Sequence, residues 1–373
     1  MIKSLEYVSA IQPYVPGKPI AELERELGIK NSVKLASNEN PLGPSPKAVE
    51  ALTAYLAKGN DLHRYPEGGG YYLKSALSGK LSKGGVTVGP DNLILGNGSN
   101  ELLDVAVRTF MGPGDEAVMA RPSFIVYFLA VQSVGGKAVQ VPLTSDYRHD
   151  LLKMADAVTG RTRMVFVANP NNPTGTSNRK DEFEQFMKRI PDGVLVVVDE
   201  AYFEYVQDPD YPDTLSYYAD GRDILLLRTF SKAYGLAGLR IGYGIAKAEV
   251  LNELNRIREP FNTSTPAQLA ALHALGDSEH LKRSVEVNEQ GKQYLYRELG
   301  GLGIPYVPTE TNFIYLPLGR DAKALYEALL RKGVIVRPMG PHEIRVTIGR
   351  PEENERFIEA LKTVIAFIAF VAL

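Results

Sequence analysis

The stretch Ser231-Lys232-Ala233-Tyr234-Gly235-Leu236-Ala237-Gly238-Leu239-Arg240 follows an apolar run at 224–227 that has the character of a buried strand. A lysine at the end of such a strand is partly desolvated, which lowers its pKa and leaves a neutral amine. A neutral amine can form a Schiff base with an aldehyde, and the guanidinium of Arg240 can hold a phosphate on the same molecule. The stretch therefore favours a phosphorylated aldehyde such as pyridoxal phosphate, against the plainer interpretation of Lys232 as a solvated surface lysine.

The composition excludes several classes of function. The 373 residues suffice for two domains, and the 42 basic and 44 acidic residues nearly balance, so we expect no nucleic-acid partner. The absence of cysteine excludes disulfides, thiolate–metal sites and a cysteine nucleophile, and we expect no metal site. The N-terminus lacks the apolar core of a signal peptide, and the apolar run 364–373 is too short to span a bilayer. We expect a cytoplasmic protein with no membrane partner, whose last residues pack on the core as a helix or strand.

Short apolar runs alternate with helical patterns through the middle of the chain. Runs that are apolar at consecutive positions indicate strands covered on both faces, so an α/β fold with a mostly parallel central sheet is predicted. The runs lie at 93–95, 117–119, 138–141, 164–167, 194–198, 224–227 and 241–245. In such a sheet, ligands bind beyond the carboxyl ends of the strands.

The pattern changes after about Pro260, where helical segments dominate up to about Gly300. Short strands follow at 313–316, 334–336 and 344–348, which predicts a second, smaller α+β domain. We expect an N-terminal arm at 1–40 that forms part of the small domain, a large cofactor-binding domain at 41–265, and a connecting helix with the C-terminal small domain at 266–373.

The segment Gly96-Asn97-Gly98-Ser99-Asn100-Glu101 leads from a predicted strand into a helix. Backbone amides at that helix start can bind a phosphate, helped by the helix dipole. A dinucleotide fingerprint is a weaker interpretation, because its third small position is occupied by Glu101. A plain helix cap at Ser99 or Asn100 would explain the polar residues without any ligand.

Asp199 ends the strongly apolar run 194–198. A carboxylate there is costly unless it has a cationic or hydrogen-bonded partner. The ring nitrogen of pyridoxal phosphate is such a partner, and a carboxylate keeps it protonated so that the ring can accept electrons. Two alternatives stay open, an aspartate that caps the next helix and a metal ligand, although no histidine cluster accompanies it among the five histidines.

Other segments that can carry chemistry have ordinary structural alternatives. The loop 168–175 either presents asparagine donors or is simply rich in turns, and Phe124 can stack on a flat ring or fill the core. The glycine-rich loop at 64–70 lacks the ending of a nucleotide-binding P-loop. Arg337 and Arg345 suit a carboxylate or phosphate if they face a cleft, and otherwise lie at the surface.

The order of these segments along the chain resembles that of the fold-type I pyridoxal-phosphate-dependent aminotransferases. The matching segments are Asn38-Glu39-Asn40-Pro41, Arg64-Tyr65-Pro66, Gly98-Ser99-Asn100-Glu101, Pro122-Ser123-Phe124, Asn171-Asn172-Pro173-Thr174-Gly175, Asp199-Glu200-Ala201-Tyr202, 231–240 and 345–349. More narrowly, the chain is similar to the histidinol-phosphate aminotransferases from about Tyr14 to Arg350. The resemblance implies the fold-type I transferase fold and amino transfer from L-histidinol phosphate to 2-oxoglutarate, a step of histidine biosynthesis.

The resemblance also implies roles for individual residues. Lys232 is expected to hold the cofactor and move a proton, Asp199 to pair with the ring nitrogen, and Tyr202 to hydrogen-bond the ring oxygen. The other implied cofactor-binding residues are Ser99, Asn100, Glu101, Phe124, Asn172, Thr229, Ser231 and Arg240, with Tyr65 reaching the cofactor of a neighbouring subunit. Asn100 stands where many relatives carry Asp, but backbone amides beside it can still bind phosphate. The implied substrate-binding residues are Tyr14, Asn38, Asn312, Arg337 and Arg345.

The implied partners are a small-molecule amino donor, a 2-oxo acid, and a second copy of the chain in a homodimer with sites at its interface. An aromatic amino-acid aminotransferase on the same fold is the nearest alternative, followed by a phosphothreonine-type decarboxylase that uses the same cofactor. From other classes, a nicotinamide-dependent dehydrogenase would use the glycines at 96 and 98. A regulator that binds the cofactor without catalysis usually carries a DNA-binding domain, and we expect none before Asn38.

Overall fold

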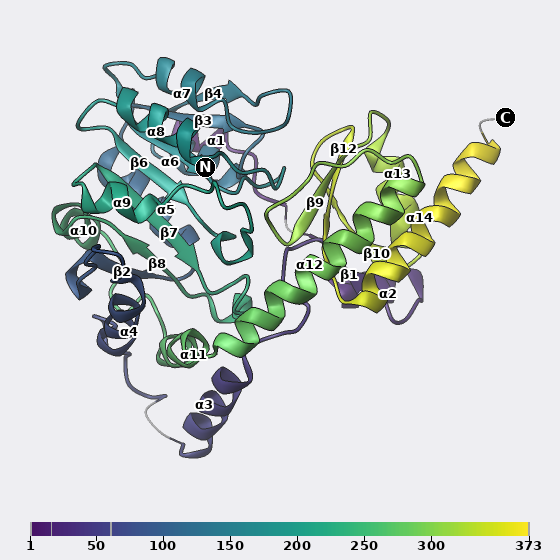
Figure 1. Cartoon of the computed structure of the whole chain (residues 1–373), viewed down its shortest axis with the longest axis horizontal. Helices are drawn as coiled ribbons and strands as arrows, with labels where there is room; N and C mark the ends of the chain where they lie inside the picture. Colours follow the sequence, from purple (N-terminus) through teal and green to yellow (C-terminus); the bar gives the residue numbers. More distant parts are fainter. Residues whose placement is uncertain (1, 16, 60–61, 372–373) are drawn as a thin grey trace.

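The computed structural model describes residues 2–15, 17–59 and 62–371, with side chains as far as Ile365 (Figure 1). All the apolar runs predicted for the middle of the chain form one sheet, in the order β2-β8-β7-β6-β5-β3-β4. The pairings of β8 with β2 and β7 are antiparallel, and the other pairings are parallel. The strands are β2 (Leu93–Gly96), β3 (Glu116–Arg121), β4 (Lys137–Pro142), β5 (Thr162–Ala168), β6 (Leu195–Asp199), β7 (Ile224–Thr229) and β8 (Gly242–Ile245).

Helices cover both faces of this sheet, which explains why its strands are apolar at consecutive positions. On β6, Val196 and Val198 belong to one hydrophobic cluster and Val197 to another, because successive side chains of a strand point to opposite faces. The first cluster takes in α3 (Pro46–Ala57), α4 (Tyr71–Leu81), α7 (Leu151–Asp156), α8 (Lys180–Arg189), α9 (Thr214–Ala219) and α11 (Thr265–Leu275). The second takes in α5 (Ser99–Phe110), α6 (Ile125–Ser133) and α10 (Ala248–Asn255).

A smaller α+β part follows the long helix α12 (Ser278–Gly301), which runs from the large sheet to this part in Figure 1. Its three-stranded antiparallel sheet has the order β11-β12-β9, with β9 (Phe313–Pro317), β11 (Arg337–Pro338) and β12 (Glu343–Thr347). It has its own hydrophobic core, to which α12, α13 (Ala322–Arg331) and α14 (Pro351–Val371) contribute. Within the described residues, no helix is both long and apolar enough to cross a bilayer.

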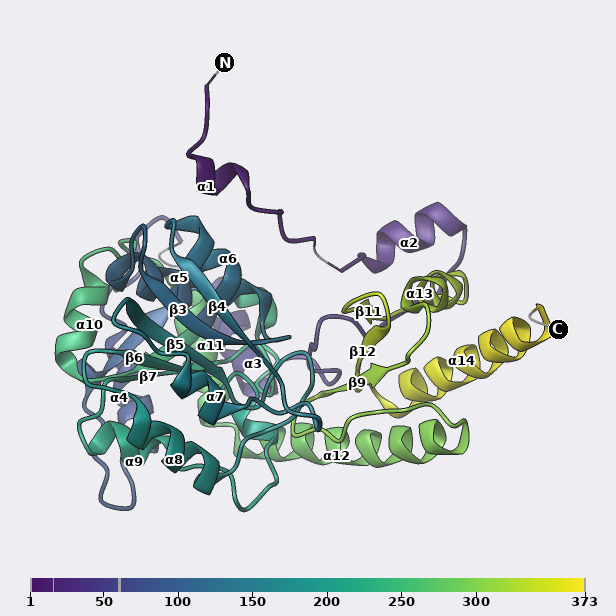
Figure 2. The same cartoon turned by 90° about the horizontal axis from the view of Figure 1, so that it is seen from above.

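The N-terminal residues connect the two parts of the molecule, as Figure 2 shows. Helix α1 (Glu6–Ser9) lies against α6 beside the large sheet. Helix α2 (Ile20–Leu27) and strand β1 (Val33–Lys34) lie with the small part, where β1 pairs in parallel with β10 (Val334–Ile335). The side chain of Leu23 packs against Ala36 and Ile335.

Helix α11 packs with the large sheet, although the C-terminal unit was predicted to start at residue 266. Ala267, Ala270, Ala271 and Ala274 of α11 are buried in the core of the large sheet. The helix that leaves the large sheet is α12. We therefore propose a division after about Leu275, since small side chains let α11 pack closely on α3 and α4.

Candidate active site

A cavity of about 480 Å³ lies at the carboxyl edge of the large sheet, where it meets the small part. Its volume is in the range of small-molecule sites. Strands β5, β6 and β7 deliver their last residues or the loops after them to it, as expected for an open parallel sheet. The predicted site residues that line it are Tyr14, Asn38, Ser99, Asn100, Phe124, Asn172, Asp199, Tyr202, Thr229, Ser231, Lys232, Arg240, Arg337 and Arg345.

Lys232 lies in the loop between β7 and the 3₁₀ helix η3 (Ala237–Leu239). Its Nζ donates a hydrogen bond of 3.3 Å to the carbonyl oxygen of Ser37 and lies 5.6 Å from the ring centre of Tyr202. Burial is the main cause that lowers the pKa of Lys232 to about 8, and the positive charge of Arg345 lowers it further. The neutral fraction of this amine near neutral pH is therefore a minority, but it is far larger than that of an ordinary lysine.

Asp199, at the end of β6, is buried and accepts two hydrogen bonds. Tyr127 Oη donates to its Oδ2 at 2.8 Å, and the Ala201 amide donates to its Oδ1 at 3.1 Å. Burial raises the pKa of Asp199 to about 6, and these two hydrogen bonds oppose the rise. A cationic partner within the cavity would keep this carboxylate ionised.

Tyr127 is a site residue that the sequence analysis missed. Its ring stacks on Phe166 with centres 4.9 Å apart, and its edge meets Phe124 at 5.5 Å. Phe124 immediately precedes α6, and Tyr127 follows one turn later, so both side chains point to the same side. That three-residue spacing was the available signal.

The start of α5, where a phosphate site is predicted, presents backbone amides that no side chain caps. The helix begins at Ser99 after Gly98, whose φ of 74° and missing side chain leave the first-turn amides without a side-chain cap. A Cβ at Gly98 would collide with the guanidinium of Arg240. Arg240 Nη1 donates to Ser231 Oγ at 3.2 Å, which places a guanidinium and a hydroxyl beside the helix start. Such an arrangement suits a phosphate dianion.

Arg345 of β12 is buried at the opposite end of the cavity. Its Nη1 donates to Asn172 Oδ1 at 2.6 Å and its Nη2 to the Ala36 carbonyl at 2.7 Å. Its buried Nε has no partner in the structure, so the guanidinium retains an unused donor. Arg337 lies nearer the surface, donating to Val15 O at 2.8 Å with its guanidinium 5.4 Å from the Tyr14 ring centre.

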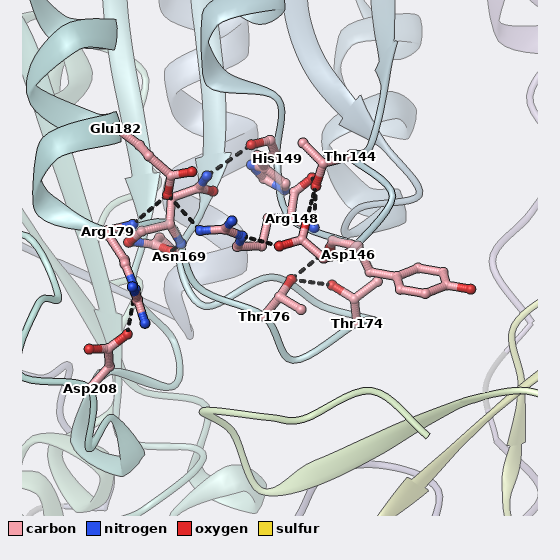
Figure 3. Close-up of polar contacts among 12 residues, drawn as sticks. Thr144, Asp146, Arg148, His149, Asn169, Thr174, Thr176, Arg179, Glu182 and Asp208 are labelled. Atoms are coloured by element: carbon pink, nitrogen blue, oxygen red, sulfur yellow. Dashed lines mark hydrogen bonds and ion pairs between the residues drawn. The ribbon is translucent and has the colours of Figure 1, made fainter. Parts of the chain in front are cut away.

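Figure 3 shows the hydrogen bonds that hold the loop carrying Asn172 after β5. Thr174 and Thr176 share a hydrogen bond of 2.8 Å, and Thr176 Oγ1 donates to the carbonyl of Tyr147 at 2.7 Å. Asn169 Oδ1 accepts from the Asn178 amide at 2.8 Å, which closes the other end of the loop. The loop is therefore well supported, and the Asn172 side chain is held in place.

Three predicted site residues lie outside this cavity. The carboxylate of Glu101 accepts from the Asn97 amide and from Asn262 Nδ2, both at 2.6 Å, so it closes the turn before α5 and does not line the cavity. Asn312 donates from Nδ2 to the Asn38 carbonyl at 3.0 Å, behind the cavity wall. In both positions a polar side chain satisfies nearby backbone, which spacing along the sequence does not reveal.

Tyr65 is also outside the cavity of its own chain. Its side chain is 82% exposed and stacks on Phe261, itself 47% exposed, with ring centres 4.7 Å apart. Two exposed aromatic rings in one contact are unusual for a free surface. The role expected for Tyr65 in a neighbouring subunit's site stays a prediction.

The residues in the cavity fit pyridoxal phosphate by their chemistry. An amine of lowered pKa can bind its aldehyde, and a buried carboxylate that forms no direct ion pair among the described residues can pair with its ring nitrogen. Phe124 offers an aromatic face, while Asn172 and Tyr202 offer polar groups for the ring oxygen. The uncapped start of α5, together with Ser231 and Arg240, matches the phosphate.

Comparisons with known proteins agree with this chemistry. The sequence profile of the family described as "Aminotransferase class I and II" matches residues 30–361. The chain is 51% identical over 369 residues to the histidinol-phosphate aminotransferase of Moorella thermoacetica, covering 98% of this chain and 93% of that protein. It is 48% identical to histidinol-phosphate aminotransferase 2 of Pseudomonas aeruginosa, covering 96% of each.

A solved structure has the same architecture. The crystal structure of the histidinol-phosphate aminotransferase from Sinorhizobium meliloti in complex with pyridoxal-5'-phosphate superposes with a TM-score of 0.88. The two chains are 28% identical, and the match covers 99% of each.

Proposed function

The chain belongs to the class I and II aminotransferases, and from this premise we propose that it transfers the amino group of L-histidinol phosphate to 2-oxoglutarate. The products are imidazole-acetol phosphate and glutamate, and the cofactor is pyridoxal phosphate. The two half-reactions use one site in turn, which makes the kinetics ping-pong.

One observation carries this proposal: Lys232, Asp199 and Arg345 converge on a single cavity from separate parts of the chain. The amine and the carboxylate lie at the ends of neighbouring strands of the large sheet, whereas the guanidinium comes from the small part. An amine, an acid and an anion-binding group in one enclosed space are what amino transfer between charged substrates requires.

Bound pyridoxal phosphate supplies an aldehyde that accepts the amino group and a ring that withdraws electrons from the reacting carbon. The chain's own residues supply the rest. Lys232 Nζ would take the proton from the reacting carbon of the substrate, hold it, and give it back within the same site, a task suited to an amine with a pKa of about 8. Asp199 would hold the ring nitrogen in its protonated form, because a buried carboxylate is stabilised by a cationic partner.

Arg345 and Arg337 give the substrate end of the cavity its anion preference. Histidinol phosphate presents a phosphate there, and 2-oxoglutarate presents a carboxylate. The unused Nε donor of Arg345 is available for either group. Tyr14, whose ring lies beside Arg337, is placed to cover the imidazole.

A homodimer with shared sites belongs to the same proposal. Six large apolar side chains that are more than two-fifths exposed fall within residues 49–72: Val49, Leu56, Leu62, Tyr65, Tyr71 and Tyr72. Such a concentration is typical of a surface that a second copy covers. We propose that Tyr65 then contacts the cofactor phosphate held by the second copy.

The decisive test is a comparison of steady-state rates with three amino donors. With 2-oxoglutarate as acceptor, we expect kcat/KM for histidinol phosphate to exceed that for phenylalanine or tyrosine by at least about 100-fold, because two arginines can bind its phosphate. Equal or higher values with phenylalanine or tyrosine would instead establish an aromatic amino-acid aminotransferase. Release of carbon dioxide without glutamate formation would indicate a decarboxylase.

A further inference from the structure

Asn38 was expected to bind substrate, but its side chain is engaged elsewhere. Its Nδ2 donates to Tyr202 Oη at 2.9 Å, and its Oδ1 accepts from Thr347 Oγ1 at 3.0 Å. Its backbone amide donates to the same Thr347 oxygen at 2.9 Å, and its carbonyl accepts from Asn312 Nδ2. Every polar group of Asn38 therefore has a partner, and the residue is 1% exposed.

These contacts fix which end of the Asn38 amide faces the cavity. Thr347 Oγ1 accepts from the Asn38 backbone amide, so its own proton is free to be donated, and it goes to Asn38 Oδ1. The Nδ2 end must then point to Tyr202. The backbone of Asn38 has a φ of 57°, a left-handed conformation that asparagine tolerates. The hydrogen bonds of its backbone amide and carbonyl stabilise this conformation.

The consequence for Tyr202 is directional. Its oxygen accepts a hydrogen bond from Asn38 Nδ2, so its own O–H must donate to another group. The side chain lines the cavity beside Lys232, and that group therefore lies in the cavity. Burial raises the pKa of Tyr202 to about 12, so the phenol stays protonated and can only donate with that proton. A donor whose oxygen also accepts a hydrogen bond is a stronger donor.

We propose that Asn38 is a positioning residue that aims the Tyr202 hydroxyl at the cofactor's ring oxygen and strengthens its hydrogen bond. The inference rests on the proposed use of pyridoxal phosphate in this cavity. It adds a second chain of hydrogen bonds that connects the small part to the cofactor. Arg345 and Thr347 are alternate residues of β12 and point to the same face. Arg345 reaches Asn172 directly, and Thr347 reaches Tyr202 through Asn38.

The test is the pH midpoint of the visible absorption change of the holoenzyme's bound cofactor, measured without substrate. Asn38→Gly removes the amide and keeps the left-handed backbone, so both backbone hydrogen bonds can persist. A weaker donor to the ring oxygen favours its ionised form less, so we expect the midpoint to rise by about half a unit to one unit. The ionisable groups that interact with Tyr202 are unchanged in this variant; they are Lys232, Asp199, Arg345, Tyr14, Tyr127 and Tyr205.

A double-mutant cycle separates this role from a general structural one. Tyr202→Phe by itself should raise the midpoint. The double variant with Asn38→Gly should have the same midpoint as Tyr202→Phe. Thr347→Val should move the midpoint in the same direction as Asn38→Gly, whereas Thr347→Ser, which keeps the hydroxyl, should restore the wild-type value. The Thr347 pair decides the question if Asn38→Gly does not fold.

An unchanged midpoint in Asn38→Gly, or the same shift with and without the Tyr202 hydroxyl, would overturn the inference. Because no substrate enters this measurement, its outcome is independent of whether histidinol phosphate is the amino donor. The wild-type rates with the three donors decide that separate question.

Discussion

Arg345 and Asn172, which are 173 positions apart in the sequence, are joined by a hydrogen bond of 2.6 Å from Nη1 to Oδ1. Arg345 lies on β12 of the small part, and Asn172 lies in the loop that follows β5 of the large sheet. The group that we expect to bind the substrate anion therefore already holds a residue that we expect to contact the cofactor. Both ends of the cavity respond when either residue is changed.

The first prediction concerns Arg345→Lys. A lysine has one charged centre and cannot reach Asn172, Ala36 and a substrate anion together, so we expect kcat/KM for histidinol phosphate to fall by about 100-fold. Arg337→Lys is the matched control and should lose much less, because Arg337 is more exposed. Similar losses in the two variants would show that Arg345 is not the main anion-binding group.

The second prediction uses the pKa of Asp199 in the protein without cofactor. Its folded pKa of about 6 lies above the ordinary value of 3.8, so the folded state binds a proton that the unfolded state has already released between these values. The contribution of Asp199 to stability is therefore present below pH 3.8 and is lost as pH rises towards 6.

Asp199→Asn removes this titration and still accepts the Tyr127 hydrogen bond. In urea denaturation of the cofactor-free proteins, the variant should gain stability relative to wild type across that window, by roughly 3 kcal/mol in total. Bound cofactor should reverse the ranking, since its ring nitrogen is a cation for Asp199. A difference between the two proteins that does not vary with pH would contradict the assignment.

The third prediction concerns how fast the cofactor-free protein captures pyridoxal phosphate. Only the neutral amine of Lys232 reacts, and its fraction rises with pH through a pKa of about 8, against 10.5 for an ordinary lysine. The rate of capture, measured by trapping the covalent adduct with borohydride at each pH, should therefore increase with a midpoint near pH 8. Lys232→Ala should remain folded by circular dichroism and capture nothing. A midpoint near 10.5 would show that Lys232 is solvated.

Much of the fold could be predicted because burial on both faces leaves a local signature. The seven apolar runs all became strands of one sheet, and the last residue of β6 and the loops after β5 and β7 supplied Asp199, Asn172 and Lys232 to the cavity. The two-residue strand β11 escaped notice, since so short a strand has no period. The contact of Glu101 with Asn262 could not be predicted, because the two residues are 161 positions apart.

The residues behind the cavity were less accessible from sequence. The roles of Tyr127 and Asn38 depend on partners 72 and 164 positions distant, and no local pattern gives such pairings. Each is a neutral polar residue whose importance comes from what it contacts. The division that we propose after α11 could not be read from the sequence for a similar reason, because the alanines of this helix carry no indication of which core they enter.

The fourth prediction concerns the buried ion pair behind the site. Glu200 Oε2 and Arg228 Nε are 2.8 Å apart, and both side chains are almost entirely buried, with Arg228 also stacked on Phe203 at 3.7 Å. Glu200→Ala removes the only carboxylate in direct contact with the buried guanidinium among the described residues and leaves it the weaker attraction of Glu204, so the free energy of unfolding should fall by about 3 kcal/mol. Glu184→Ala, which breaks the exposed pair with Lys188, should cost far less, because solvent screens that pair. Equal losses in denaturant melts would contradict this ranking.

The fifth prediction tests whether Tyr65 serves the site of a second copy. Lys232→Ala lacks the amine and Tyr65→Ala lacks the exposed phenol, so each variant alone should be inactive or nearly so. In a mixed dimer, one site would combine Lys232 of one copy with Tyr65 of the other and would be complete. Random reassociation of equal amounts should therefore recover roughly a quarter of wild-type activity, because half of the dimers are mixed and each has one complete site.

Lys232→Ala mixed with Asp199→Asn is the matched control. Both of these lesions lie in the cavity of their own chain, so every site in that mixture keeps one defect and no activity should return. No recovery in the Tyr65 mixture would place Tyr65 outside a shared site, and recovery in the control would contradict the placement of Lys232 and Asp199 in the cavity of one chain.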